Sequence, residues 1–137
     1  MRIKSITLKP FAGIRDKIVE FLPGLNVIIG PNEAGKSTLL NALKSVLFNN
    51  VNLTKTKYER LMKEYMPAQG GNTIRVYLDF QVEGKNYWLE KTWNAGGKNG
   101  SCLFKFEDDS EYTGDNEVSM LINKYLQLRK ELLGIFY

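Results

Sequence analysis

Apolar positions along the first fifty residues predict two strands, a third strand buried on both faces, and then a helix. Apolar and polar residues interleave over 2–9 and again over 17–22, with turns between and after them. The run 25–29, Leu-Asn-Val-Ile-Ile, is almost continuously apolar, which is typical of a strand covered on both sides. Over 36–48 the apolar residues recur on one helical face. This order is strand, loop, helix.

Further along the chain, the pattern predicts a helix followed by a hairpin. Residues 55–65 predict a basic helix packed on the sheet. Alternatively, they predict a nucleic-acid-binding segment, because the stretch contains both basic and aromatic residues. Residues 74–82 alternate as a half-buried strand, with Asp79 on the outward face. A tight turn at Gly84-Lys85 leads into a second strand over 86–93, on which Tyr87 and Trp88 lie on opposite faces.

Two segments complete the predicted elements. The glycine-rich stretch 94–101 contains Lys98, but apolar residues typical of a strand follow it, so we expect a hairpin loop and not a phosphate-binding loop. Residues 115–133 predict a helix with Asp115 as its N-cap. The apolar end of the chain, 132–137, predicts a fragment cut before a second lobe or a subunit that dimerises.

The loop between the buried strand and the helix carries the candidate chemistry. It matches G-x-x-x-x-G-K-[ST], and its glycines let successive N–H groups point at phosphate oxygens, next to the positive end of the following helix. Lys36 is placed to reach the β- and γ-phosphates of ATP, Ser37 to bind Mg²⁺, and Thr38 to lie near the α-phosphate. The predicted nucleotide-binding residues are Gly30, Asn32, Glu33, Ala34, Gly35, Lys36, Ser37 and Thr38.

Composition narrows the chemistry further. The chain has 137 residues, suited to one domain, with one cysteine and no histidine, so internal disulfides, Ser-His triads and His-ligated zinc are excluded. The first ten residues lack the apolar run of a signal peptide or membrane span, and we expect a cytoplasmic protein. Residues 1–66 carry eleven Lys and Arg against five Asp and Glu, whereas 67–137 carry eight against ten, so the front half suits an anionic ligand.

The opening of the chain also resembles a known family. MRIKSITLKPF, followed by IVEFLPGLNVIIGPNEAGKSTLLNAL, is similar to the N-terminus of SMC-type DNA repair ATPases, the SbcC-like double-strand-break repair group with RecF- and RecN-like relatives. The resemblance covers residues 1–48 well and extends more loosely to about residue 93. It implies an α/β P-loop NTPase fold, the first lobe of an ABC/SMC-type head with a mixed or antiparallel sheet, and residues 1–137 as the N-terminal part of one ATPase domain.

The resemblance also implies that ATP lies between two heads and that other motifs complete the site. These are a glutamine loop, a signature motif and an aspartate-glutamate pair, and the second lobe that carries the last two is absent from this sequence. Gln69, Gln81 and Gln127 do not have the setting of the glutamine loop, and Asp79 is followed by Phe80 instead of glutamate. No catalytic residue is assigned. Where family members carry a basic residue in the first turn, this chain has Ala12. Arg15, three residues later, is an alternative nucleotide contact, but we favour its reading as a solvated turn residue.

Three functions are compatible with these observations. The first is the ATP- and Mg²⁺-binding part of a head involved in DNA repair or chromosome maintenance, with DNA, a second head or lobe and a nuclease as partners of the complete protein. The second is the ATPase part of an OLD-type ATP-dependent nuclease. The third is a nucleotide-binding or interaction module that does not hydrolyse ATP. In each case we expect this segment alone to bind nucleotide and to have little ATPase activity.

Overall fold

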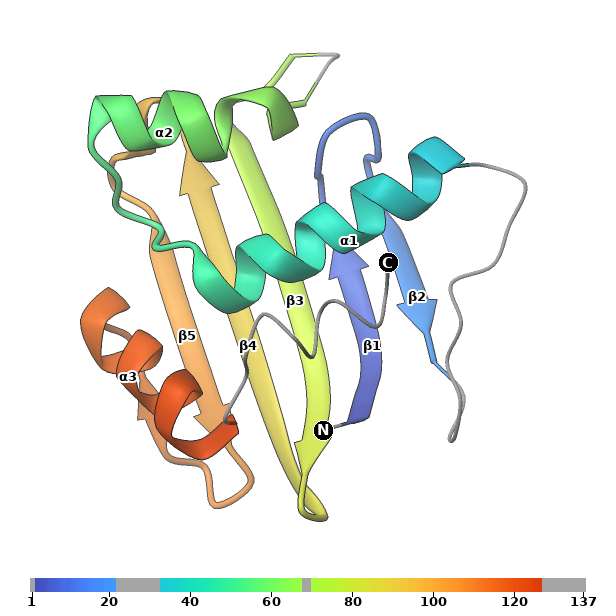
Figure 1. Ribbon diagram of the computed structural model, residues 1–137, viewed down its shortest axis with the longest axis vertical. Helices are drawn as coiled ribbons and strands as arrows, with labels where there is room; N and C mark the ends of the chain where they lie inside the picture. Colours follow the sequence, from blue (N-terminus) through green and yellow to red (C-terminus); the bar gives the residue numbers. More distant parts are fainter. Residues whose placement is uncertain (1, 22–32, 68–69, 127–137) are drawn as a thin grey trace.

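The computed structural model describes residues 2–21, 33–67 and 70–126, and for residues 33–36, 125 and 126 it describes the backbone alone. Its main feature is a sheet of six antiparallel strands in the order β2-β1-β3-β4-β5-β6 (Figure 1). The strands are β1 (Arg2–Leu8), β2 (Lys17–Glu20), β3 (Thr73–Val82), β4 (Lys85–Asn94), β5 (Ser101–Phe106) and β6 (Glu111–Tyr112).

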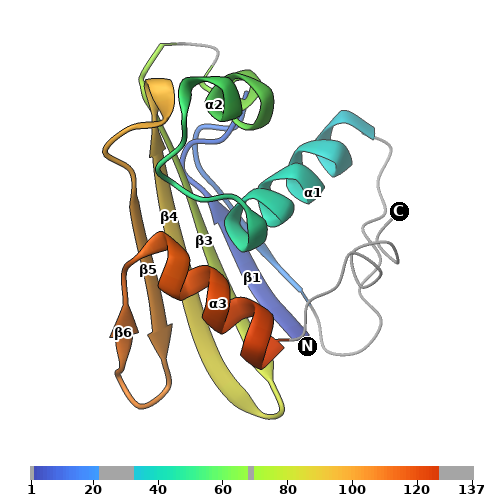
Figure 2. The same cartoon turned by 60° about the vertical axis from the view of Figure 1, so that its left-hand side comes forward.

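The described helices all lie on one side of this sheet (Figure 2). They are α1 (Glu33–Phe48), α2 (Lys55–Leu61) and α3 (Asp115–Leu126), with short 3-10 turns η1 (Lys63–Tyr65) and η2 (Ala95–Gly97). Figure 1 shows α1 crossing the middle of the sheet, α2 at its upper end and α3 beside β5. The result is a two-layer α/β arrangement, which confirms the predicted fold class.

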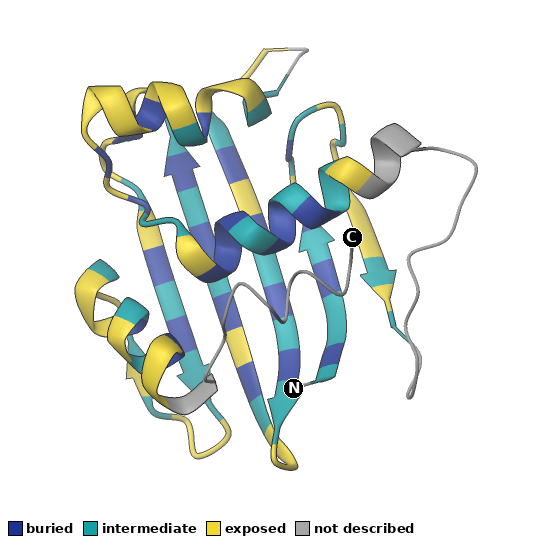
Figure 3. Cartoon of the chain, viewed as in Figure 1, coloured by how far each residue is buried: buried dark blue, intermediate teal, exposed yellow. Residues whose placement is uncertain are grey.

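The core lies between these two layers because the strands alternate as the sequence predicts. Along β3, the buried side chains are Ile74, Val76, Leu78 and Phe80, and on β4 they are Tyr87, Leu89, Lys91 and Trp93. Figure 3 shows the resulting stripes of buried and less buried positions along the strands. Period-two alternation thus puts one set of side chains under the helices and leaves the other on the opposite face.

The β3–β4 hairpin differs from the prediction by one residue. The two-residue turn is Glu83-Gly84, since Val82 pairs with Lys85, and not Gly84-Lys85 as the sequence suggested. Both turn residues have positive φ, 52° for Glu83 and 80° for Gly84, the conformation that matches the right-handed twist of a two-residue hairpin. Because this turn sets the register, Tyr87 is buried and Trp88 lies on the open face, which confirms their predicted opposition.

The predicted helix over 55–65 forms as two pieces, α2 and η1, that join at Met62. Thr54 caps α2, because its hydroxyl accepts a hydrogen bond from the Lys57 amide at 3.2 Å. Tyr58 and Met62 are buried, and the Tyr65 ring stacks on Phe11 with centroids 4.8 Å apart. The packing confirms a helix that covers the end of the sheet.

Other predictions fall partly or wholly outside the described residues. The strand over 25–29 and the tail over 132–137 lie there, as do Gln69 and Gln127. The predicted helix over 115–133 is described as far as Leu126.

Candidate nucleotide-binding site

The predicted phosphate-binding loop leads directly into α1. Residues 33–38 have helical backbone, so their amides form the first turns of a helix of 16 residues. Ser37 is exposed and Thr38 is half-buried, whereas nothing is described of the side chains of residues 33–36. Gly30 and Asn32 lie outside the described residues. The structure therefore gives the helix start and the exposure of one hydroxyl, and the loop itself stays a prediction.

One face of α1 fixes this helix on the sheet. Leu40, Leu43, Val46 and Leu47 are buried in the core, at the spacing that the sequence predicted. Ser45 lies on the same buried side and satisfies its hydroxyl by donating to the Asn41 carbonyl at 2.7 Å. Burial of this face leaves Ser37, one turn from the helix start, in solvent.

The far end of α1 is held by two donors from β4. The Lys91 amine donates to the carbonyl oxygen of Asn49 at 2.8 Å, and the Trp93 indole Nε1 donates to that of Asn50 at 2.8 Å. These carbonyls directly follow the helix end at Phe48, where carbonyl groups lack helical partners. A cation in this position also interacts favourably with the negative end of the helix dipole.

A carboxylate from α3 holds the next two residues. Asp115 Oδ1 accepts a hydrogen bond from the Val51 amide at 2.9 Å, and its Oδ2 accepts one from the Asn52 amide at 3.0 Å. The prediction that Asp115 is the N-cap of its helix is wrong, because Asp115 is already the first helical residue. Its carboxylate stabilises the 49–52 segment instead. We call this segment, with Lys91, Trp93 and Asp115, the α1 clamp.

Burial changes the acidity of two groups in this region. Lys91 is 1% exposed, and burial lowers the pKa of its amine. Burial raises the pKa of the neighbouring Cys102 thiol from 9.0 to about 11, so this thiol is neutral and unreactive at physiological pH. Both shifts follow from desolvation, and neither group faces the first turn of α1.

The sequence analysis did not identify the α1 clamp. A signal for it exists, because Lys91 occupies an inward position of a strand whose other inward residues are Tyr87, Leu89 and Trp93. A lysine among such neighbours needs an acceptor for its amine. Which acceptor it finds depends on packing between segments 42 residues apart, which the local pattern does not give.

The remaining candidates lie away from the start of α1. Asp79 is on the sheet face opposite the helices, as predicted for an outward strand residue. Gln81 is on β3, and its Nε2 donates to Asn86 Oδ1 at 2.8 Å. Arg15 is exposed in the β1–β2 connection, consistent with a solvated turn residue.

The glycine-rich stretch 94–101 connects β4 to β5, as predicted. The Gly97 carbonyl accepts from the Leu53 amide at 2.7 Å, and the Gly100 amide donates to Asn52 Oδ1 at 3.2 Å. These bonds fix the loop on the segment before α2. Lys98 is exposed at its edge. The structure thus confirms a loop between two strands, and this loop packs β4 and β5 against the segment before α2.

ATP and Mg²⁺ fit the described part of the predicted site. A helix start offers free amide N–H groups and partial positive charge to phosphate, and an exposed hydroxyl such as Ser37 is a hard oxygen ligand suited to Mg²⁺. Within the described ranges, no group of three or more His, Cys, Asp or Glu side chains could hold a metal ion. None of the helices in this part of the chain is long and apolar enough to cross a membrane.

Comparison with known proteins finds a matching domain family and similar DNA repair proteins. The family model described as AAA domain matches residues 5–136. The chain is 31% identical over 135 residues to the DNA double-strand break repair Rad50 ATPase of Thermoplasma volcanium, and 29% over 134 residues to that of Sulfolobus acidocaldarius. It is also 31% identical over 90 residues to the DNA replication and repair protein RecF of Desulfitobacterium hafniense.

These alignments cover most of the chain but a small part of each relative. They cover 96%, 98% and 66% of the chain, respectively, and 14%, 14% and 23% of the relatives. The matches confirm the resemblance to the head segment of SMC- and Rad50-like DNA repair ATPases.

Proposed function

We propose that this chain, which belongs to the AAA domain family of P-loop ATPases, binds the phosphates of ATP with Mg²⁺ at the start of α1. The observation that carries the proposal is the position of the sequence motif: residues 33–38 form the first turns of α1, and Ser37 there is exposed. A helix that begins at such a loop provides amide donors and a positive dipole end for phosphate.

Each predicted residue has a distinct part in this binding. The glycines at 30 and 35 let the backbone approach the phosphates, and the amides of the residues between them donate to phosphate oxygens. Lys36 neutralises charge on the β- and γ-phosphates, Ser37 binds Mg²⁺, and Thr38 adds a hydroxyl near the α-phosphate. Mg²⁺, when bound, neutralises the phosphates and orients them.

Hydrolysis needs groups that we do not assign to this chain. A carboxylate must position the attacking water, and further positive charge must stabilise the transition state. Asp79 does not supply the first, since it alternates with the buried residues Leu78 and Phe80 on β3 and so lies on the sheet face opposite the core and α1. We therefore expect this chain alone to bind ATP and to hydrolyse it slowly or not at all.

The direct test is a titration of the purified chain with a fluorescent ATP analogue in Mg²⁺. Replacement Lys36→Ala should abolish binding, because it removes the charge that contacts two phosphates. Lys98→Ala is the matched control: it removes an exposed lysine from the other glycine-rich loop, and we expect affinity to change by less than about twofold. Tight binding by the Lys36 variant, or equal losses in both variants, would contradict the proposal.

In the complete protein we propose ATP-driven engagement of two heads and DNA binding. Support comes from the relatives, whose names describe DNA double-strand break repair and DNA replication and repair. The exposed cations of α2 and η1, which are Lys55, Lys57, Arg60 and Lys63, suit a phosphate backbone. A nuclease partner of the complete protein belongs to the same proposal. The alternatives are the ATPase part of an OLD-type nuclease and a module that does not hydrolyse ATP, and the named relatives favour the repair ATPase.

A further inference from the structure

The open face of the sheet carries a hollow that the proposed nucleotide site does not use. Among the described elements, all helices cover the opposite face (Figure 2). The hollow has a volume of about 180 Å³ and lies over β1, β3, β4 and β5. Its lining includes the aromatic rings of Tyr77 and Trp88, the side chain of Leu103, and the carboxylates of Asp79 and Glu90.

Asp79 lies in the middle of this surface. It faces Ser5 on β1 and Trp88 on β4 across the strands. Its Oδ1 atom is buried and has no hydrogen-bond partner in the structure. A buried carboxylate oxygen without a donor costs free energy, because its water is lost and nothing replaces it. The free protein thus holds an acceptor in the hollow that a ligand's N–H group could satisfy.

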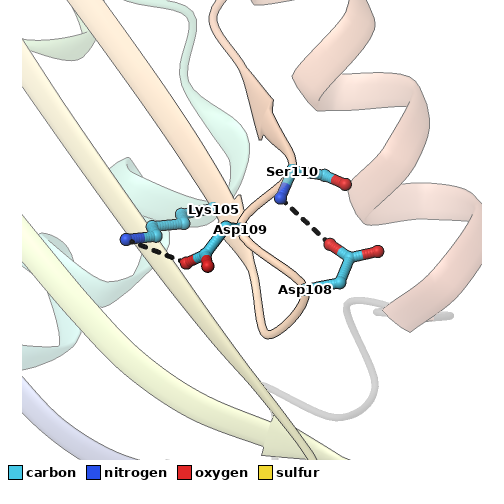
Figure 4. Close-up of polar contacts among 4 residues, drawn as sticks. All are labelled: Lys105, Asp108, Asp109 and Ser110. Atoms are coloured by element: carbon cyan, nitrogen blue, oxygen red, sulfur yellow. Dashed lines mark hydrogen bonds and ion pairs between the residues drawn. The ribbon is translucent and has the colours of Figure 1, made fainter.

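The cation in the lining of the hollow is already paired with another residue. Lys105 lines its edge, but its amine lies 3.5 Å from Asp109 Oδ1, at the β5–β6 turn (Figure 4). The neighbouring Asp108 accepts a hydrogen bond from the Ser110 amide at 3.0 Å, which fixes this turn. The carboxylates of Asp79 and Glu90 therefore leave net negative charge in the hollow, next to an indole that is 39% exposed.

We propose that this hollow binds an arginine or lysine side chain presented by a partner protein. A cationic group can donate to Asp79 Oδ1 while it lies against the Trp88 ring, and such a group is attracted by both. The carboxylates would repel nucleic acid, and a purely apolar partner would bury Asp79 without a donor. Trp, Tyr and Arg are also the residues that most often dominate binding at protein interfaces.

The experiment uses the full chain and an acetylated pentapeptide with a central arginine between two leucines. A second peptide has citrulline in place of arginine, which keeps the shape and removes the charge. Binding is followed by the indole and amide NMR signals of Trp88 and Asp79, and light scattering reports self-association. The variants are Asp79→Asn, Trp88→Phe and, as a control on the opposite layer, Glu117→Gln, which removes an exposed carboxylate.

We expect the arginine peptide to bind at least about tenfold more tightly than the citrulline peptide. Asp79→Asn should remove that preference, Trp88→Phe should weaken binding, and Glu117→Gln should change nothing. Because Asp79 Oδ1 has no partner to lose, Asp79→Asn should keep or raise the melting temperature, and its ATP affinity should stay within a few-fold. If the chain binds ATP normally but does not bind the arginine peptide, the proposed hollow is wrong and the proposed ATP-binding function still holds.

Several results would overturn the proposal. Equal affinity for the two peptides would mean that the hollow recognises apolar groups and not charge. A marked fall in the melting temperature of Asp79→Asn would show that the carboxylate serves the fold. Self-association that disappears in Asp79→Asn would make a second copy of this chain the occupant, and absence of binding at millimolar peptide would reject the site.

Discussion

Replacing Asp115 by alanine tests whether one carboxylate holds the segment that follows the nucleotide-binding helix. In the native protein, this carboxylate accepts hydrogen bonds from the Val51 and Asn52 amides, at 2.9 and 3.0 Å. Alanine cannot accept either bond, and it has a high helix propensity, so the helix itself should tolerate the change. The effect should therefore report the lost contacts of the α1 clamp.

The two amides differ in what they lose. Val51 is 1% exposed, so water cannot reach its N–H, and leaving that donor unpaired costs about 1–3 kcal/mol. Asn52 is exposed, and its N–H can turn to water at a cost of roughly 1 kcal/mol or less. We expect a total loss of about 1–4 kcal/mol in the free energy of unfolding. For a chain of this size, this corresponds to a fall of roughly 3–15 °C in Tm.

Urea unfolding followed by circular dichroism measures this loss. The matched control is Glu117→Ala, which removes an exposed carboxylate from the first turn of the same helix. That variant loses only a favourable interaction with the helix dipole, about 0.3–1 kcal/mol. If the two variants are equally stable, the hydrogen bonds to Val51 and Asn52 do not stabilise the fold and our account of the clamp is wrong.

Two further predictions concern the same part of the core. A Cβ on Gly100 would lie 2.5 Å from the Val51 carbonyl oxygen and 2.7 Å from that of Thr92, so Gly100→Ala should destabilise the fold by about 2–4 kcal/mol in urea unfolding. The control is Gly13→Ala, because a Cβ there meets open space and should change stability by less than about 1 kcal/mol. Burial raises the pKa of the Cys102 thiol to about 11, so the contribution of this thiol to the free energy of unfolding is complete below pH 9 and is lost as pH rises through 11. The difference in that free energy between wild type and Cys102→Ala should therefore shrink from pH 9 to 11. A difference that stays constant with pH would contradict this prediction.

The pattern of apolar and polar residues predicts a strand or helix well where burial of one face alone decides which positions are apolar. Residues 74–82 alternate strictly because one face of β3 lies under the helices, and period two follows directly from strand geometry. The hairpin turn was placed one residue late because Glu83 adopts a positive φ, which residues with a Cβ rarely do. The glycine at 84 signals a turn but does not say on which side of it the turn begins.

Hydrogen bonds between residues far apart in the sequence explain why the sequence did not predict the α1 clamp. An aspartate before a helical pattern predicts an N-cap, which is a local interaction. Asp115 instead binds amides 64 and 63 residues earlier in the chain, because α3 packs beside the end of α1. Lys91 likewise finds its acceptor in Asn49, on another element. Such partners depend on how the layers meet, and sequence periodicity carries no information about that.

The arrangement of α1 separates ligand binding from anchoring. Its 16 residues span roughly 24 Å, with the proposed phosphate site at one end and the Lys91 contact just beyond the other. Over that distance the charge of Lys91 does not act on the phosphates directly, since helix dipole effects are confined to the terminal turns. The clamp therefore contributes stability and a fixed axis for the helix, whereas affinity for phosphate depends on the first turn. An Asp115 variant that keeps its fold should accordingly keep the ATP affinity of the wild type, because its effect is confined to the anchored end.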